Sequence, residues 1–245
     1  MPRSSRRPSA TGHYHIIIRG VNRQNIVQDD QDRSKMINTL WKYSSESDAR
    51  ILAYCLMDNH LHLLIRAADG AAMFVKKVAS SYVYYFNHKY DRIGHLFQDR
   101  YKSEAVDTEE YLLNVARYIL QNPLKAGICG IKDYPWSSWK SIATGEGFCD
   151  TELLCECAGD RASLISFCLA PSNDSCLDTG DNKTLKDEDA LRLLQQISGL
   201  TNPQDIVALP RPEQKAVLIQ AKAKGLSIRQ LSRLTGLDRN IVQRA

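Results

Sequence analysis

The sequence predicts an α+β protein with two folded parts, and three observations support this class. Up to Val106, short stretches alternate between apolar and polar residues, which is the period of a β-strand. Between these stretches, apolar residues recur every three or four positions, which is the period of a helix. Near the C-terminus only the helical period remains, over short segments separated by glycines. The 245 residues are long enough for both parts.

Four strands are expected in the first part, each ended by residues that favour turns. Gly20 ends the first strand, and Asp58-Asn59 forms a tight turn between the second and the third. The expected ranges of the strands are 13–20, 51–57, 60–65 and 101–106.

Three helices accompany these strands, over 29–48, 71–90 and from 107 onward. In the third, Asp107 and Glu110 are spaced as a variant of the capping box. Pro123 stops this helix, so Asn122 is expected in its frayed last turn.

The order strand, helix, strand, strand, helix, strand is the ferredoxin-like βαββαβ pattern, an antiparallel sheet with both crossover helices on one face. The third helix comes after the last strand, so we expect it to lie across the open face as an added catalytic helix.

A His-x-His pair stands within the third strand, at His60 and His62. Side chains of a strand alternate between the two faces, so both imidazoles point the same way, close enough to hold one divalent cation. Two half-exposed histidines with ordinary hydrogen bonds are the alternative. His13 and His15 form a competing pair, ranked lower because its apolar triplet follows the pair instead of alternating with it.

A second pair of polar residues, Tyr118 and Asn122, lies four positions apart on the expected third helix. This spacing places both side chains on one helix face. Tyr118 could supply a phenol nucleophile, and Asn122 a third, oxygen ligand for the cation.

Together, the stretches 60–62, 96–102, 118–127 and 134–138 resemble the HUH-type single-tyrosine transposases of the IS200-like superfamily, and within it the REP-associated tyrosine transposases. The resemblance covers about residues 13–140.

The resemblance implies that Tyr118 attacks a DNA phosphodiester, giving a 5′-phosphotyrosine adduct and a free 3′-hydroxyl. It implies that His60, His62 and Asn122 hold the metal, for which mixed nitrogen and oxygen ligands suit Mg²⁺ or Mn²⁺, with zinc as the alternative. The substrate would be single-stranded DNA from hairpin-forming repeats.

Charge is distributed unevenly along the chain. Residues 1–145 carry a net charge of +6, residues 146–190 carry −8, and residues 210–245 carry +6. Two basic parts around an acidic one suit two modules that face nucleic acid. The residues expected to contact DNA are Arg100, Lys102, Arg117, Lys76, Lys77, Arg229, Arg233 and Arg239.

Four segments follow from this pattern. Residues 1–12 read as a disordered basic arm, 13–145 as the catalytic domain, 146–200 as an acidic, partly helical connector, and 201–245 as a DNA-binding domain. In the last, helices over 212–224, 227–234 and 238–244 predict a helix-turn-helix with 238–244 as its recognition helix. A small helical bundle for protein contacts is the alternative.

Other expectations concern the setting of the protein. No apolar run approaches the ~18 residues of a membrane helix, and seven cysteines without disulfide spacing indicate the reducing cytoplasm. We expect a monomer or homodimer without membrane contact. Three other functions stay open: a domesticated, non-catalytic DNA-binding regulator, a replication-initiator or relaxase-type nickase, and a metal-dependent hydrolase that forms no adduct.

Overall fold

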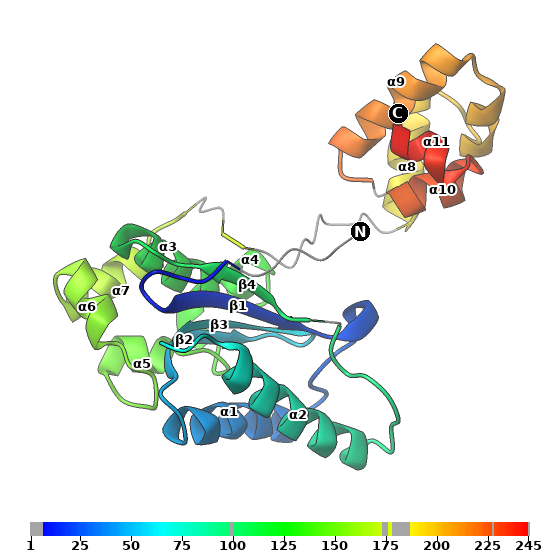
Figure 1. Ribbon diagram of the computed structural model, residues 1–245. Helices are drawn as coiled ribbons and strands as arrows, with labels where there is room; N and C mark the ends of the chain where they lie inside the picture. Colours follow the sequence, from blue (N-terminus) through cyan, green and yellow to red (C-terminus); the bar gives the residue numbers. More distant parts are fainter. Residues whose placement is uncertain (1–6, 99, 173–175, 178–186, 227, 245) are drawn as a thin grey trace. The chain divides into compact units, whose positions relative to one another are not determined.

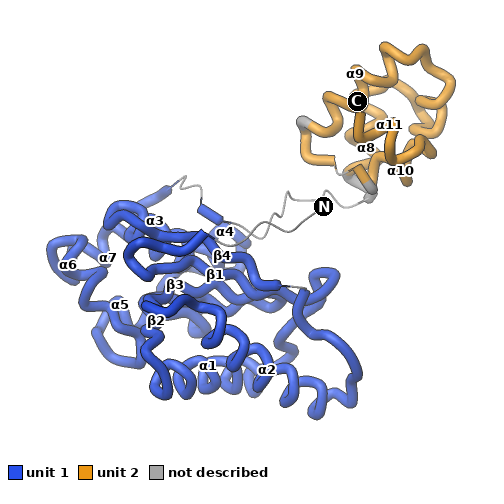
Figure 2. Tube along the Cα trace, in the orientation of Figure 1, with its two compact units in different colours: residues 1–179 blue, residues 180–245 orange. Residues whose placement is uncertain are grey.

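The computed structural model describes residues 7–98, 100–172, 176–177, 187–226 and 228–244. The chain divides into two compact units, Met1–Thr179 and Gly180–Ala245 (Figure 2). Among the described residues, each unit has a hydrophobic core of its own.

The first unit is built on a four-stranded antiparallel sheet in the order β2-β3-β1-β4 (Figure 1). This confirms the α+β class. In the central pair, Ile17 of β1 lies opposite His62 of β3. The strands are β1 (His13–Arg19), β2 (Arg50–Leu56), β3 (His60–Arg66) and β4 (Lys102–Ala105).

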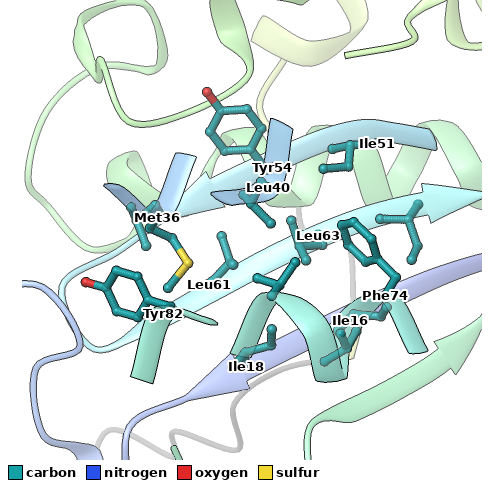
Figure 3. Packing of buried hydrophobic residues seen from close by; sticks show 14 of the residues in the cluster. Ile16, Ile18, Met36, Leu40, Ile51, Tyr54, Leu61, Leu63, Phe74 and Tyr82 are labelled. Atoms are coloured by element: carbon teal, nitrogen blue, oxygen red, sulfur yellow. The ribbon is translucent and has the colours of Figure 1, made fainter. Parts of the chain in front are cut away.

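Helices α1 (Asp30–Ser45) and α2 (Ala72–Lys89) cover one face of this sheet (Figure 1). Leu61 and Leu63 of β3 point into this layer, and Figure 3 shows Leu63 beside Phe74 of α2 and Leu61 on the side of Met36 and Tyr82. Burial of such side chains stabilises each by about 1.5–3 kcal/mol relative to exposure. The face of β3 that carries Leu61 and Leu63 therefore belongs to an ordinary hydrophobic core.

As expected, helix α3 (Glu109–Leu120) lies across the opposite face of the sheet. Leu64 of β3 and Val115 of α3 belong to a second core on this side. Helices α5 (Trp139–Thr144), α6 (Glu152–Ala158) and α7 (Arg161–Leu169) complete this layer.

The segment expected as an acidic connector therefore differs in the structure. Leu154 of α6 and Leu164 of α7 are fully buried in the second core, while Glu152 and Glu156 of α6 remain exposed. Only these two of the eleven acidic residues in 146–190 lie on α6 and α7, and the apolar side of both helices faces α3. The division between the units falls after Thr179.

Short elements join these parts of the first unit. Three of them carry residues that matter for the site or for the edge of the sheet. They are η1 (Val21–Arg23), α4 (Asn122–Lys125) and η2 (Ile131–Asp133).

The stretch 134–138 covers the outer edge of β2. The backbone N–H of Leu56 donates to the carbonyl of Trp136 over 2.9 Å, and the N–H of Ser138 donates to the carbonyl of Tyr54, also over 2.9 Å. Unpaired strand edges invite association with other chains. The stretch thus satisfies backbone groups that would otherwise stay exposed.

The expected capping residue of α3 is replaced by its neighbour. The Thr108 side chain, not that of Asp107, accepts from the backbone N–H of Tyr111 over 3.2 Å. Asp107 instead accepts from the Ser9 hydroxyl at 2.7 Å and from the Ala10 N–H at 2.8 Å. The described end of the expected arm is therefore tied to the start of α3, while residues 1–6 lie outside the described residues.

The second unit is all-helical, with short helices around a core that includes Leu194, Leu218, Leu231 and Val242. It begins earlier than the expected residue 201, because α8 contributes to this core. Its elements are α8 (Asp187–Ser198), η3 (Pro203–Ala208), α9 (Arg211–Ala223), α10 (Ile228–Thr235) and α11 (Arg239–Arg244).

Within the described residues, none of the helices combines the length and hydrophobicity needed to span a membrane.

At Gly20, the loop that follows β1 packs closely against its own backbone and bonds to the turn before His60. Its N–H donates to the carbonyl of Asn59 over 2.9 Å, and a Cβ built on it would lie 2.1 Å from the carbonyl oxygen of Gln24. Because that obstacle is backbone, we expect Gly20→Ala to lower the free energy of unfolding by about 1–3 kcal/mol in denaturant titrations.

The matched control is Gly130→Ala, whose Cβ would meet only the Asp133 carboxylate. Both glycines have φ −64°. A control that loses as much stability as Gly20→Ala would contradict the close approach at Gly20.

Candidate functional site

Three histidines and one tyrosine gather between the sheet and α3. His15 comes from β1, His60 and His62 from β3, and Tyr118 from the last turns of α3. The ring of Tyr118 meets His62 at 5.8 Å and His15 at 6.0 Å between centroids, in both cases edge to face. His60 and His62 lie 4.8 Å apart. The structure thus brings the predicted histidine pair and the predicted tyrosine together.

His62 lies at the centre of this cluster and is fully buried. Its Nδ1 is 3.1 Å from Nε2 of His15, while its Nε2 is buried and has no hydrogen-bond partner among the residues that the structure describes. Burial, followed by the nearby His60, His15 and Lys125, lowers the pKa of His62 well below its usual value. A neutral imidazole with one unsatisfied nitrogen is the form that ligates a metal ion.

His60 reaches the edge of the cluster and is only partly buried. Its Nδ1 lies 2.6 Å from the side-chain oxygen of Asn59. The turn that carries Asn59 is held by the preceding loop, where Asn22 and Arg23 adopt positive φ angles of 50° and 65°. Non-glycine residues in this region cost about 1–3 kcal/mol, and such strain gathers at functional sites.

Lys125 lies against the candidate nucleophile. Its Nζ is 4.1 Å from the centroid of the Tyr118 ring. A cation over an aromatic face is attracted by the ring, and a positive charge nearby favours an anionic phenolate. Lys125 is not among the site residues expected from the sequence, although it lies within the stretch 118–127 that carries the resemblance.

Asn122 stands at the break between two helices. α3 ends at Leu120, and α4 begins at Asn122 with Pro123 in its first turn, where a proline fits well. The Asn122 Nδ2 donates to the carbonyl of Tyr118 at 2.9 Å and to that of Ile119 at 3.2 Å. Neither bond uses the side-chain oxygen, so Asn122 closes the end of α3 with an acceptor left over.

The donor set fits a divalent cation only in part. Nε2 of His62 is an unsatisfied buried nitrogen, His60 lies beside it, and Asn122 offers an amide oxygen. Among the described residues, no three His, Cys, Asp or Glu side chains gather to hold one metal ion. A cation at this site would therefore take two histidines and complete its coordination with oxygen from Asn122, DNA or water.

Two other tyrosines of the first unit, Tyr111 and Tyr82, donate their hydroxyl protons to nearby acceptors. The Tyr111 hydroxyl donates to the Glu104 carboxylate over 2.6 Å, and the Tyr82 hydroxyl donates to the carbonyl of Ile26 over 2.7 Å. Burial raises the pKa of both phenols, and at Tyr111 the hydrogen bond to Glu104 raises the pKa further. Neither environment favours an attacking phenolate.

The predicted DNA-contacting residues of the first unit are dispersed. Lys76 and Lys77 are exposed on α2, across the sheet from the histidines, and Arg100 and Lys102 are exposed at β4. Arg117 is different, because its guanidinium lies 3.9 Å over the ring of Phe167 in α7 and donates to Asn114.

In the second unit, Arg233 of α10 and Arg239 of α11 are exposed. The side chain of Arg229 lies outside the described residues. A pocket of about 450 Å³ between α9 and α11 is lined by Arg211, Lys215 and Arg244, which adds positive charge to this unit.

Comparison with known proteins gives one family. Residues 9–122 match the profile of the family described as "Transposase IS200 like". His60, His62, Tyr118 and Asn122 all lie within the matched segment. None of the curated proteins matches the chain.

Two solved structures are similar. The structure of a REP-associated tyrosine transposase bound to a REP hairpin aligns with a TM-score of 0.50 and 18% identity, over 62% of this chain and 90% of that one. A structure described as a candidate transposase from Deinococcus radiodurans R1 aligns with a TM-score of 0.35 and 16% identity, over 51% of this chain and 97% of that one.

The burial of His62 has a measurable consequence for stability. Its pKa in the folded protein is lowered from 6.5, so the unfolded chain binds the proton more tightly. The contribution of the neutral His62 to the stability of the fold is therefore fully present above pH 6.5 and is lost as the pH falls below 6.5. We expect the free energy of unfolding to drop by up to about 1.4 kcal/mol per pH unit from this residue.

Denaturant titrations between pH 5 and 8 would measure this loss, and His62→Leu should remove it. His88→Ala, at an exposed histidine of α2, is the control and should retain the wild-type slope. An unchanged slope in His62→Leu would contradict the assignment of a neutral, buried His62.

Proposed function

Because residues 9–122 of this chain form a domain of the IS200-like transposase family, we propose that the protein cleaves and rejoins single-stranded DNA with Tyr118 as its nucleophile. The observation that carries the proposal is the contact of the Tyr118 ring with His62 on one side and with the Lys125 ammonium on another. A phenol with a pKa near ~10 needs such a cation to attack at neutral pH.

The chemistry proceeds by exchange of one ester for another. The Tyr118 oxygen forms a bond to phosphorus, the bond from phosphorus to the 3′-oxygen breaks, and that oxygen takes up a proton. The phenol loses its proton, and the phenolate is stabilised by Lys125. The adduct is a 5′-phosphotyrosine, which keeps the ester energy, so a 3′-hydroxyl can displace Tyr118 and rejoin the DNA without ATP.

The protein would hold a divalent cation, Mg²⁺ or Mn²⁺, through His60, His62 and the Asn122 oxygen. When bound, such a cation polarises a nonbridging phosphate oxygen and neutralises part of its charge. The role of His60 and His62 is to fix the position of the phosphate relative to Tyr118. Asn122, through its bonds to the end of α3, joins that position to the helix that carries the nucleophile.

The proposal also covers the fold of the first unit, the DNA substrate and the role of the second unit. The strand order β2-β3-β1-β4, with α1 and α2 on one face, supports a ferredoxin-like fold. The similar structure that holds a REP hairpin supports hairpin-forming repeats as the substrate. Helices α10 and α11, with exposed Arg233 and Arg239, support a helix-turn-helix that binds DNA.

The nucleophile is tested by removing one oxygen. Tyr118→Phe keeps the ring that packs on His62 and His15, so it should fold and bind DNA as the wild type does. With Mn²⁺ and an oligonucleotide that forms a REP-type hairpin, it should give no covalent adduct on a denaturing gel, whereas the wild type should give one.

The matched control is Tyr111→Phe on the same helix, which should keep adduct formation. If Tyr111→Phe abolishes the adduct and Tyr118→Phe does not, the nucleophile is wrongly assigned. Wild-type cleavage without any adduct would indicate a metal-dependent hydrolase instead.

The second unit is tested by its removal. Its core contains no residue of the first unit, so a chain that ends at Thr179 should keep its fold. Every phosphate that the shortened chain no longer neutralises reduces the salt slope by about 0.7–0.9, so affinity for the hairpin DNA should fall and depend less on salt. Cleavage of an unpaired oligonucleotide should persist. The same salt slope in both chains would assign the second unit to protein contacts.

A further inference from the structure

The contact between His15 and His62 is the best-defined polar contact of the buried cluster. Both side chains are fully buried, and Nε2 of His15 lies 3.1 Å from Nδ1 of His62. The two rings stack with 5.4 Å between centroids and 28° between planes. β1 and β3 are neighbouring antiparallel strands, and their register places Ile17 opposite His62, so His15, two residues along β1 on the same face, is the diagonal neighbour of His62.

One proton must lie between these two nitrogen atoms, because two lone pairs at that distance repel each other. If His15 donates from Nε2, a neutral His62 carries its own proton on Nε2. If His62 donates from Nδ1, the lone pair of its Nε2 is free. Only the second arrangement lets His62 bind a cation through the nitrogen that no other group satisfies.

We propose that His15 is a positioning residue: its Nε2 accepts the Nδ1 proton of His62 and so keeps the His62 Nε2 lone pair directed at a divalent cation. The inference rests on the proposed function, since it assumes a cation at the histidine pair. A histidine that binds a metal ion through one ring nitrogen generally donates a hydrogen bond from the N–H of the other ring nitrogen to a carboxylate, a carbonyl or water. Loss of that acceptor lowers metal affinity or activity by about 10–100-fold. Here an imidazole fills the place of the usual carboxylate or carbonyl.

The choice of an imidazole is consistent with the dry surroundings of His15. The rings of His15 and Tyr118 lie edge to face, with 6.0 Å between their centroids. Neither His15 nor His62 has any surface exposed to water. A buried carboxylate here would carry a charge with a high desolvation cost. A neutral acceptor orients His62 without that cost.

The test uses the full chain without DNA and measures Mn²⁺ binding by titration calorimetry. His15→Leu fills the buried space but offers no acceptor, so we expect about 10–100-fold weaker Mn²⁺ binding. His15→Gln offers a carbonyl oxygen near the position of Nε2 and should restore most of the affinity. Equal thermal unfolding of the two variants would show that packing is not the cause.

A second readout reports the tautomer without metal. Ring ¹H–¹⁵N correlation spectra should show His62 protonated on Nδ1 in the wild type and in His15→Gln, and a shift toward the Nε2 form in His15→Leu. A merely structural role for His15 would not move this signal.

The control is His13→Leu, the other histidine of the His-x-His pair on β1. Its ring contacts Thr11 at 2.9 Å and not His62, so Mn²⁺ affinity should not change. Wild-type affinity in His15→Leu, together with loss of binding in His62→Leu, would overturn the role of His15 and leave the metal site standing. Unchanged Mn²⁺ binding in His62→Leu would overturn the metal site itself, and with it this inference.

Discussion

The alternation of side chains along β3 is the constraint on which the rest of the first unit depends. Leu61 and Leu63 enter the core beneath α1 and α2, while His60, His62 and Leu64 face α3. A slip of one residue in the pairing of β3 with β1 would exchange these two sets. Burial of the leucines on one face of β3 therefore fixes the direction of the histidines on the other face. The free energy gained by burying apolar side chains in this way also positions the polar site.

A site built in this way is unusually dry. α3 covers the histidines, and α6 and α7 cover α3, so His62 and Tyr118 lie between two hydrophobic layers. Burial in these dry surroundings keeps His62 neutral. It also requires a hydrogen-bond partner for Nδ1 of His62, which His15 provides. His60 is the partly exposed member of the cluster, so DNA would approach from its side.

The order and type of the elements from β1 to α3 could be predicted from the sequence, because most of these strands and helices follow a recognisable period. The pairing of His60 with His62, and the position of Tyr118 over them, followed from the same periods. The contact of His15 with His62 could not be predicted from the sequence, since it depends on the register of β1 against β3, which is a property of the folded sheet. Lys125 was missed because the turn between α3 and α4, which returns it to Tyr118, has no periodic signal.

The segment after residue 145 shows a different limit. Its net negative charge suggested an acidic connector, yet nine of its eleven acidic residues lie outside α6 and α7, and the apolar residues of these two helices pack on α3. The apolar residues that decide the matter, such as Leu154 and Leu164, lie on helices of seven and nine residues. Helices this short contain too few turns for a period to be evident.

The central claim is that the histidine pair and Tyr118 form one site around a divalent cation. Ring signals of ¹³C-labelled tyrosines, recorded while Mn²⁺ is added, test it most directly, because the paramagnetic ion broadens only nearby signals. If the histidine pair holds the ion beside Tyr118, the Tyr118 signal broadens first. The signal of Tyr84, which is 77% exposed on α2 across the sheet, stays sharp. Broadening of Tyr84 with a sharp Tyr118 signal would contradict this claim.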